Sequence, residues 1–549
     1  MQGRLRANGM LGSVVNAKLL PRVLRDRRGN VTLIFALAAL PMLLGIGVAV
    51  DLSNATRVRL ALQDATDAAV LAVGRAGPSV PQSQLEAVAR QYMDASYNYN
   101  DIAYAISKVS YDAGAMTARL DTSADVPTTF MAMFGKTVMP VSAHSVSKAM
   151  SVEIALVLDT SGSMAEAAGD GTKIEALKQA SKALFARMYG SKVLNNRFAI
   201  SIVPFAASVN VGSGHAGAYW IDKSDSKLNT EDFESSGGHK MTKITALNPS
   251  TGMSNASWGG CVISRAKGYD VTDDAPVANR ADTLFSPWFA PDEPGPPTTQ
   301  YTVVNGAPYL NSYLDDNGGD CTADRTIDQL NAETPRKKQE RGCKYRGATP
   351  LLGRSMTGTM TGPNFLCDSQ AITPLTTTRA TLDSAVDALG PQGNTNILEG
   401  FAWGWRTLSP AEPFTGGKAY DSPNNYKVII LMTDGLNTIG AMPNINQSYY
   451  TGYGYMWQKR LRDPATSDET LNRTEANAKT AKACENAKAR GIAVYTIAFG
   501  SGAVGSRPLL KGCASRPEAP YFNAPVNASE LEPVFLKIAE SINRMRIAQ

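Results

Sequence analysis

Hydroxyl and carboxylate side chains stand where apolar runs of this sequence end. Two such runs, residues 152–158 and 427–433, are typical of buried parallel strands. Open α/β sheets place their functional groups beyond the carboxyl ends of the strands. The polar candidates that follow these runs are Asp159, Ser161, Ser163 and Asp434. A fifth candidate, Thr395, comes from a Gly-Asn segment before a predicted helix.

The elements that must position these side chains alternate between strand and helix. Further strands are predicted at 198–205 and 492–498, and helices near 174–188, 378–389, 396–405, 475–489 and 530–542. This alternation predicts an α/β fold, a doubly wound and mainly parallel sheet with helices on both faces.

The spacing Asp159-x-Ser161-x-Ser163, followed by Thr395 and Asp434, is very similar to the metal-ion-dependent adhesion site of the von Willebrand factor A domain. The resemblance covers residues 151–549 and implies a site for Mg²⁺, or alternatively Mn²⁺ or Ca²⁺. It implies that the three hydroxyls are direct ligands, whereas Asp159 and Asp434 act largely through water or hydrogen bonds. Mg²⁺ prefers hard oxygen ligands, and neutral hydroxyls leave it attractive to a carboxylate from a partner. The alternative is a turn and capping motif without metal.

Catalysis is not expected. The chain lacks G-x-x-x-x-G-K-[ST], H-E-x-x-H and G-x-S-x-G motifs. Its three histidines, His144, His215 and His239, lie far in sequence from other candidate catalytic groups. The rival interpretation is a hydrolase that uses Asp159 or Ser161.

An insertion at about residues 206–373 enlarges the predicted domain and holds four of the six cysteines. Within it we expect Cys261–Cys367 and Cys321–Cys343, and beyond it Cys484–Cys513, although six cysteines allow fifteen pairings and free thiols are the alternative. A basic run at 336–346 is interpreted as a solvated face or a site for an acidic partner. Aromatic residues at 449–457 are interpreted as a contact surface beside the metal or as packing onto the insertion.

The first 50 residues predict a membrane anchor. The formal net charge is +5, and residues 1–30 hold seven Lys or Arg and one Asp, so the rest of the chain is close to neutral. A nucleic-acid surface is therefore not expected. Residues 31–50 contain no charge, and a helix of this length spans about 30 Å, one bilayer core. A cleaved leader and a buried helix are the alternatives. The positive-inside rule places residues 1–30, a basic tail, in the cytoplasm and the body outside.

Residues 51–150 predict a pilin-like stalk, with a helix that continues from the membrane, a second helix at 83–97 and short strands. A plain spacer next to the membrane is the alternative. The segments Arg27-Arg28-Gly29-Asn30-Val31, Asp51-Leu52-Ser53 and residues 62–69 resemble the TadE/TadG-like proteins of tight-adherence (Flp) pilus assembly. Ile34 stands where a type IV pilin precursor would have Glu, which favours an uncleaved, TadG-like type.

Together these features predict a non-enzymatic protein of the bacterial inner membrane, with a periplasmic or surface-exposed body. The resemblance implies a role in assembling or anchoring pili, through metal-dependent binding to a pilus or envelope protein that offers an acidic side chain. The alternative is a surface adhesin for a host or matrix ligand.

Overall fold

The computed structural model describes residues 30–77, 80–112, 117–148, 150–169, 171–189, 197–234, 241–266, 268–323, 325–355 and 358–545. The chain divides into two compact units, Met1–Ala149 and Met150–Gln549, which are considered separately below. The basic tail lies outside the described residues.

The first unit is built on one long helix, α2 (Asn30–Ala76). Its first part exposes apolar side chains such as Ile34, Phe35 and Leu37. Among the described residues, one helix is long and apolar enough to cross a membrane, and it is this one. The predicted continuous helix, ending before Pro78, is therefore observed, and it fits a single-pass anchor.

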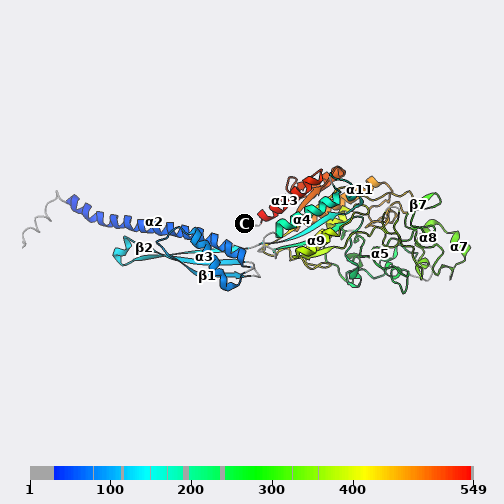
Figure 1. Cartoon of the computed structure of the whole chain (residues 1–549). Helices are drawn as coiled ribbons and strands as arrows, with labels where there is room; N and C mark the ends of the chain where they lie inside the picture. The colour runs from blue at the N-terminus through cyan, green and yellow to red at the C-terminus, as the bar shows by residue number, and fades with distance from the viewer. Residues whose placement is uncertain are drawn as a thin grey trace, which may run out of the picture. The chain divides into compact units, whose positions relative to one another are not determined.

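The second part of α2 packs against a small sheet. Buried side chains recur at helical spacing, namely Ala55, Val58, Leu62, Ala65, Ala69 and Val73. They lie against α3 (Leu85–Ser96) and the antiparallel strands β1 (Tyr104–Asp112), β2 (Thr117–Pro127) and β3 (Val138–Lys148) in the order β1-β2-β3 (Figure 1). The predicted second helix is confirmed, and the predicted strands are present but longer than expected, at 9, 11 and 11 residues.

The second unit contains a six-stranded sheet in the order β11-β10-β9-β4-β5-β8. All neighbouring strands are parallel except the edge pair β5 and β8. The central strand β4 is buried at all nine positions, as expected for a largely apolar strand of a parallel sheet. The bounds are β4 (Ser151–Asp159), β5 (Phe198–Phe205), β8 (Thr373–Thr376), β9 (Asn425–Thr433), β10 (Ala493–Ala498) and β11 (Phe522–Asn523).

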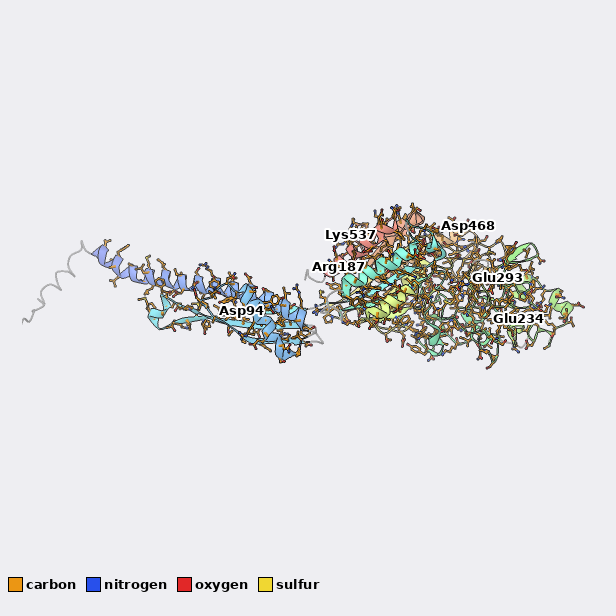
Figure 2. The ribbon with its side chains drawn as sticks, viewed as in Figure 1. Asp94, Arg187, Glu234, Glu293, Asp468 and Lys537 are labelled. Carbon is orange, nitrogen blue, oxygen red and sulfur yellow. A yellow bond between two sulfur atoms is a disulfide. The ribbon has the colours of Figure 1, made fainter. Side chains whose placement is uncertain are left out.

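Helices cover both faces of this sheet. Ile154, Leu156 and Leu158 of β4 belong to the core shared with α4 (Lys173–Tyr189), α9 (Arg379–Asp387) and α13 (Ala528–Met545). Ala155 and Val157 point the other way, toward α10 (Ile397–Leu408), α11 (Glu469–Ala489) and α12 (Arg507–Cys513). Figure 2 labels Arg187 of α4 and Lys537 of α13, and Arg187 also pairs with Glu540 at 3.3 Å. The observed class is a mixed α/β fold with a largely parallel sheet.

Helix α10 lies close to the sheet because two glycines face it. A Cβ added at Gly404 would lie 2.3 Å from Cγ2 of Val157, and one added at Gly400 would lie 2.5 Å from the Phe205 ring. These positions therefore have no room for a methyl group.

We predict that Gly404→Ala destabilises the protein. Overpacking typically costs about 1–3 kcal/mol, and alanine recovers only about 1 kcal/mol through helix propensity. The measurement is the thermal unfolding midpoint. Gly512→Ala in α12 is the matched control, because nothing lies within 4 Å of its added Cβ; it should leave the midpoint unchanged or raise it. Equal midpoints for the two variants would contradict this account of α10.

The segment between β5 and β8 is the predicted insertion, and little of it is regular. Its short elements are η5 (Ser213–Gly217), α5 (Lys227–Thr230), α6 (Lys243–Ala246), η6 (Ala281–Thr283), β6 (Thr302–Val304), β7 (Ala307–Tyr309), η7 (Cys321–Ala323), α7 (Ile327–Asn331), α8 (Pro335–Glu340) and η8 (Cys343–Tyr345). Three disulfides join Cys261 to Cys367, Cys321 to Cys343 and Cys484 to Cys513. All three predicted pairs are confirmed.

Buried acids also organise the insertion, which the sequence analysis missed. Asp292 accepts hydrogen bonds from the backbone N–H groups of Tyr313 and Leu314, at 2.6 and 2.8 Å, and its other oxygen lies 2.6 Å from Lys344. Burial raises the pKa of Asp292 to about 6. Glu293, labelled in Figure 2, accepts from two further backbone N–H groups and from Tyr455. These carboxylates replace the ladder hydrogen bonds that irregular buried backbone lacks.

The structure corrects the interpretation of the basic run and decides between the two interpretations of the aromatic residues. Within the basic run, Arg341 and Lys344 are buried, and Arg341 pairs with Glu333 at 2.8 Å, so these two cations belong neither to a solvated face nor to a partner site. Of the aromatic residues at 449–457, Tyr450, Tyr453 and Tyr455 are buried. Their partners lie in the insertion: the Tyr450 ring packs against Trp288, and the Tyr453 and Tyr455 hydroxyls donate to Asp270 and Glu293, which favours packing over a contact surface.

Candidate functional site

The five predicted site residues lie together at the carboxyl edge of the large sheet. Strand β4 ends at Asp159, which is followed by Ser161 and by the short helix η3 (Gly162–Ala165), which carries Ser163. The neighbouring strand β9 delivers Asp434 immediately after its last residue. Thr395 precedes α10. Parallel strands bring their carboxyl ends to one edge, so residues far apart in sequence meet there.

Asp159 is fully buried and fixes the first loop. One of its carboxylate oxygens accepts the backbone N–H of Ser161 at 2.8 Å, and the other accepts the hydroxyl of Thr433 at 2.5 Å. Burial and, second, the nearby charge of Asp434 raise the pKa of Asp159 to about 7. This carboxylate positions the loop and does not reach solvent.

The hydroxyls of Ser161 and Ser163 lie 3.2 Å apart, and Ser163 Oγ donates to Asp434 Oδ1 at 2.7 Å. Adjacent ligands of an octahedral Mg²⁺ ion with bonds of about 2.1 Å are separated by about 3 Å. The separation of these oxygens, which hydrogen bonds also produce, is compatible with ligands of such an ion.

Thr395 faces the same space. A Cβ added at Gly435 would lie 3.6 Å from Thr395 Oγ1 and 4.0 Å from Ser163 Oγ. The absence of a side chain at Gly435 leaves room between these hydroxyls. The loops are also joined directly, because Gly162 N–H donates to the carbonyl of Gly393 at 2.9 Å and Thr438 N–H to that of Thr395 at 2.8 Å. The residues present fit an oxygen-coordinated divalent cation.

In the described part of the chain, no cluster of three or more His, Cys, Asp or Glu side chains is placed to hold a metal ion. A metal at this edge would therefore depend on the serine and threonine hydroxyls. The ligand roles of the five residues remain a prediction.

Lys173, the first residue of α4, also belongs to this site and was not predicted from the sequence. Its ammonium lies 2.7 Å from Asp434 Oδ2 and 2.6 Å from Glu166 Oε2, and its side chain is 7% exposed. Burial alone would lower the pKa of Lys173, but the hydrogen bonds that it donates to Asp434 and Glu166 leave its pKa raised. Asp434 thus turns one oxygen to the hydroxyls and the other to a fixed positive charge.

The sequence around Lys173 contains one indication that this lysine has a charged partner. A cation in the first turn of a helix opposes the helix dipole, so an unpaired lysine there is unfavourable. Its position next to the apolar residues Ile174 and Leu177 indicates a partner from elsewhere in the fold. No sequence rule, however, identifies that partner as Asp434.

Comparison with known proteins adds one family match. Residues 29–76 match the model described as putative Flp pilus-assembly TadE/G-like. The matched segment nearly coincides with α2 and includes Asp51-Leu52-Ser53 and residues 62–69 of the resemblance, but not Arg27-Arg28. No curated protein sequence matches.

Solved structures of pilus proteins align with the chain at low similarity. The pilus adhesin SpaC from Lactobacillus rhamnosus GG aligns over 80% of this chain and 34% of its own length, with 12% identity and a TM-score of 0.32. The von Willebrand factor domain of the type V pili tip protein Mfa5 from Porphyromonas gingivalis aligns over 73% and 97%, with 12% identity and a TM-score of 0.31. The PilB minor pilin from Streptococcus sanguinis aligns over 82% and 80%, with 10% identity and a TM-score of 0.32.

Proposed function

We propose that this chain is a non-enzymatic, membrane-anchored component of a tight-adherence pilus assembly system. In this proposal the second unit is a von Willebrand factor A-like domain, doubly wound, with a metal-ion-dependent adhesion site. The observation that carries the proposal is the meeting of three hydroxyls and two carboxylates at the carboxyl edge of β4 and β9. The family match over α2 supports the pilus context.

In this mechanism each residue holds or orients an oxygen. Ser161, Ser163 and Thr395 would hold a Mg²⁺ ion, which when bound supplies an open coordination position for a carboxylate of the partner. Asp159 holds the loop that bears the two serines, through Ser161 N–H. Asp434 accepts from Ser163 and thereby orients that hydroxyl. Because the donors are mostly neutral, the bound ion would keep charge to attract an acidic partner.

The arrangement supports binding more than catalysis. Asp159 is buried and engaged by two donors, so it is not placed to take a proton from a substrate. We place the second unit outside the cytoplasm, because the positive charge lies before the apolar segment. Its three disulfides suit an oxidising compartment.

Cross-linking in intact cells tests the proposal. Full-length protein purified from cross-linked membranes in Mg²⁺ should bring down a pilus or envelope protein identified by mass spectrometry. A chelator added before cross-linking, or Ser163→Ala, should remove that protein. Ser501→Ala is the matched control, because Ser501 is exposed and makes no capping hydrogen bond. Equal recovery of the same partner with Ser163→Ala would contradict metal-dependent binding.

A further inference from the structure

The turn between β2 and β3 exposes large apolar side chains where polar turn residues are usual. It comprises residues 128–137 and contains the short helix η2 (Met131–Phe134), closed by Gly135 with φ +81°. The exposed fractions are 78% for Met133, 63% for Phe134 and 40% for Phe130, and Val138 at the start of β3 is 46% exposed. These side chains give the connection an exposed apolar surface.

The turn is fixed to α2 through Asp51. The Asp51 carboxylate accepts the backbone N–H groups of Thr129, Phe130 and Met131 at 3.0, 2.9 and 2.7 Å. Asp51 is only 5% exposed and directly follows the uncharged residues 31–50. The first charge after the apolar segment is therefore used to hold this turn against the helix.

Phe130 reaches back onto the apolar segment itself. A Cβ added at Gly47 would lie 2.6 Å from Phe130 Cγ, so the ring rests on the helix surface where the glycine leaves space. Gly47 lies three residues inside the end of the apolar segment, about 4.5 Å along the helix axis. The end of the small sheet that bears the turn lies beside α2 in Figure 1.

The position of the turn along α2 indicates that it lies at the membrane surface. On α2, Ile46, Val48 and Val50 expose 61%, 40% and 51% of their surface, so the apolar surface continues from the helix to the turn. If residues 31–50 cross the bilayer, the turn lies at the lipid headgroup level. Lys136 is exposed on the same turn, where its long side chain can reach lipid phosphates.

We propose that the β2–β3 turn is a second membrane contact, which inserts Met133 and Phe134 into the lipid interface beside the anchor. Two contacts, held together by Asp51, would fix the small sheet against the bilayer and restrict rotation of α2. This proposal depends on the membrane span alone and not on the metal site.

The test is the immersion depth of a nitroxide label. All six native cysteines form disulfides, so Met133→Cys supplies a single free thiol in the full-length protein. In vesicles of phosphatidylethanolamine and phosphatidylglycerol, the label at position 133 should collide more often with oxygen than with a water-soluble nickel complex. Lys108→Cys, an exposed position on β1, is the matched control and should show the reverse.

Two outcomes would overturn the proposal. A label at position 133 that is as accessible to the nickel complex as the label at position 108 would show that this apolar surface faces water. Dipolar broadening that grows with the protein-to-lipid ratio would show that a second copy of the chain covers it instead.

Discussion

Replacing Lys173 with methionine is expected to lower the free energy of unfolding of the metal-free protein by about 3–5 kcal/mol, the usual cost of removing one partner of a buried ion pair. Methionine keeps much of the side-chain length but leaves Asp434 without its cation. The Asp434 side chain is 0% exposed, so water cannot replace the ammonium. Chemical denaturation in the presence of a chelator measures the loss.

Lys182→Met on the same helix is the matched control. Lys182 pairs with Asp387 at 2.6 Å, but the two side chains are 39% and 60% exposed. Such surface pairs contribute about 0–1 kcal/mol. If Lys173→Met is no more destabilising than Lys182→Met, the buried pair does not stabilise the site.

The Lys173→Met substitution should also strengthen metal binding. The ammonium and a divalent cation both interact with Asp434, and like charges a few ångströms apart repel by several kcal/mol in a partly buried site. Mg²⁺ should therefore raise the unfolding midpoint of Lys173→Met by more than it raises that of the wild type. An equal shift would show that Lys173 does not influence the ion.

The second large effect is expected for Asp159→Asn, which should weaken Mg²⁺ binding by about 10–100-fold, as for other residues that orient metal ligands. Asparagine is the same size and keeps an acceptor for Ser161 N–H, so the fold should survive. Calorimetric titration measures the affinity. Asp468→Asn is the control, because Asp468 is an exposed cap of α11 and asparagine also caps helices well.

The pH dependence of stability separates this effect from damage to the fold. The pKa of Asp159 is raised in the folded protein to about 7, from an ordinary value of 3.8. The folded state thus binds the proton more tightly, so the stability of the metal-free protein should decline as pH rises from about 4 through about 7. The Asn variant lacks this titration and should show a smaller decline. A steeper decline in the variant would contradict the assignment.

The sequence predicted the elements that carry the site because their signals are local. Strand β4 is apolar from Ile154 to Leu158 and ends in Asp159, and the apolar run of β9 likewise ends beside Asp434. The Cys484–Cys513 pair followed from a predicted helix and the strand after it, and the other two pairs followed from their places at the base of the insertion and within it. The edge strand β8 was not predicted, because four residues of mixed polarity give no clear pattern.

Burial of charged residues could not be predicted in the same way. Lys173 meets Asp434 across 261 positions of sequence, and the buried Lys344 pairs with the buried Asp292. A lysine in isolation is normally solvated, so each such residue is predicted correctly only once its partner is known. The apolar turn held by Asp51 was missed for the same reason, since its helix contact is 78–80 positions away.

Calorimetric titration of the full-length protein with Mg²⁺ and Mn²⁺ in detergent tests the central claim most directly. We predict a saturable binding heat and a metal-dependent rise in the unfolding midpoint, both lost in Ser163→Ala and retained in Ser501→Ala. Wild-type protein that shows neither heat nor thermal shift with either ion would contradict the account, and the five converging side chains would then form a structural turn rather than a binding site.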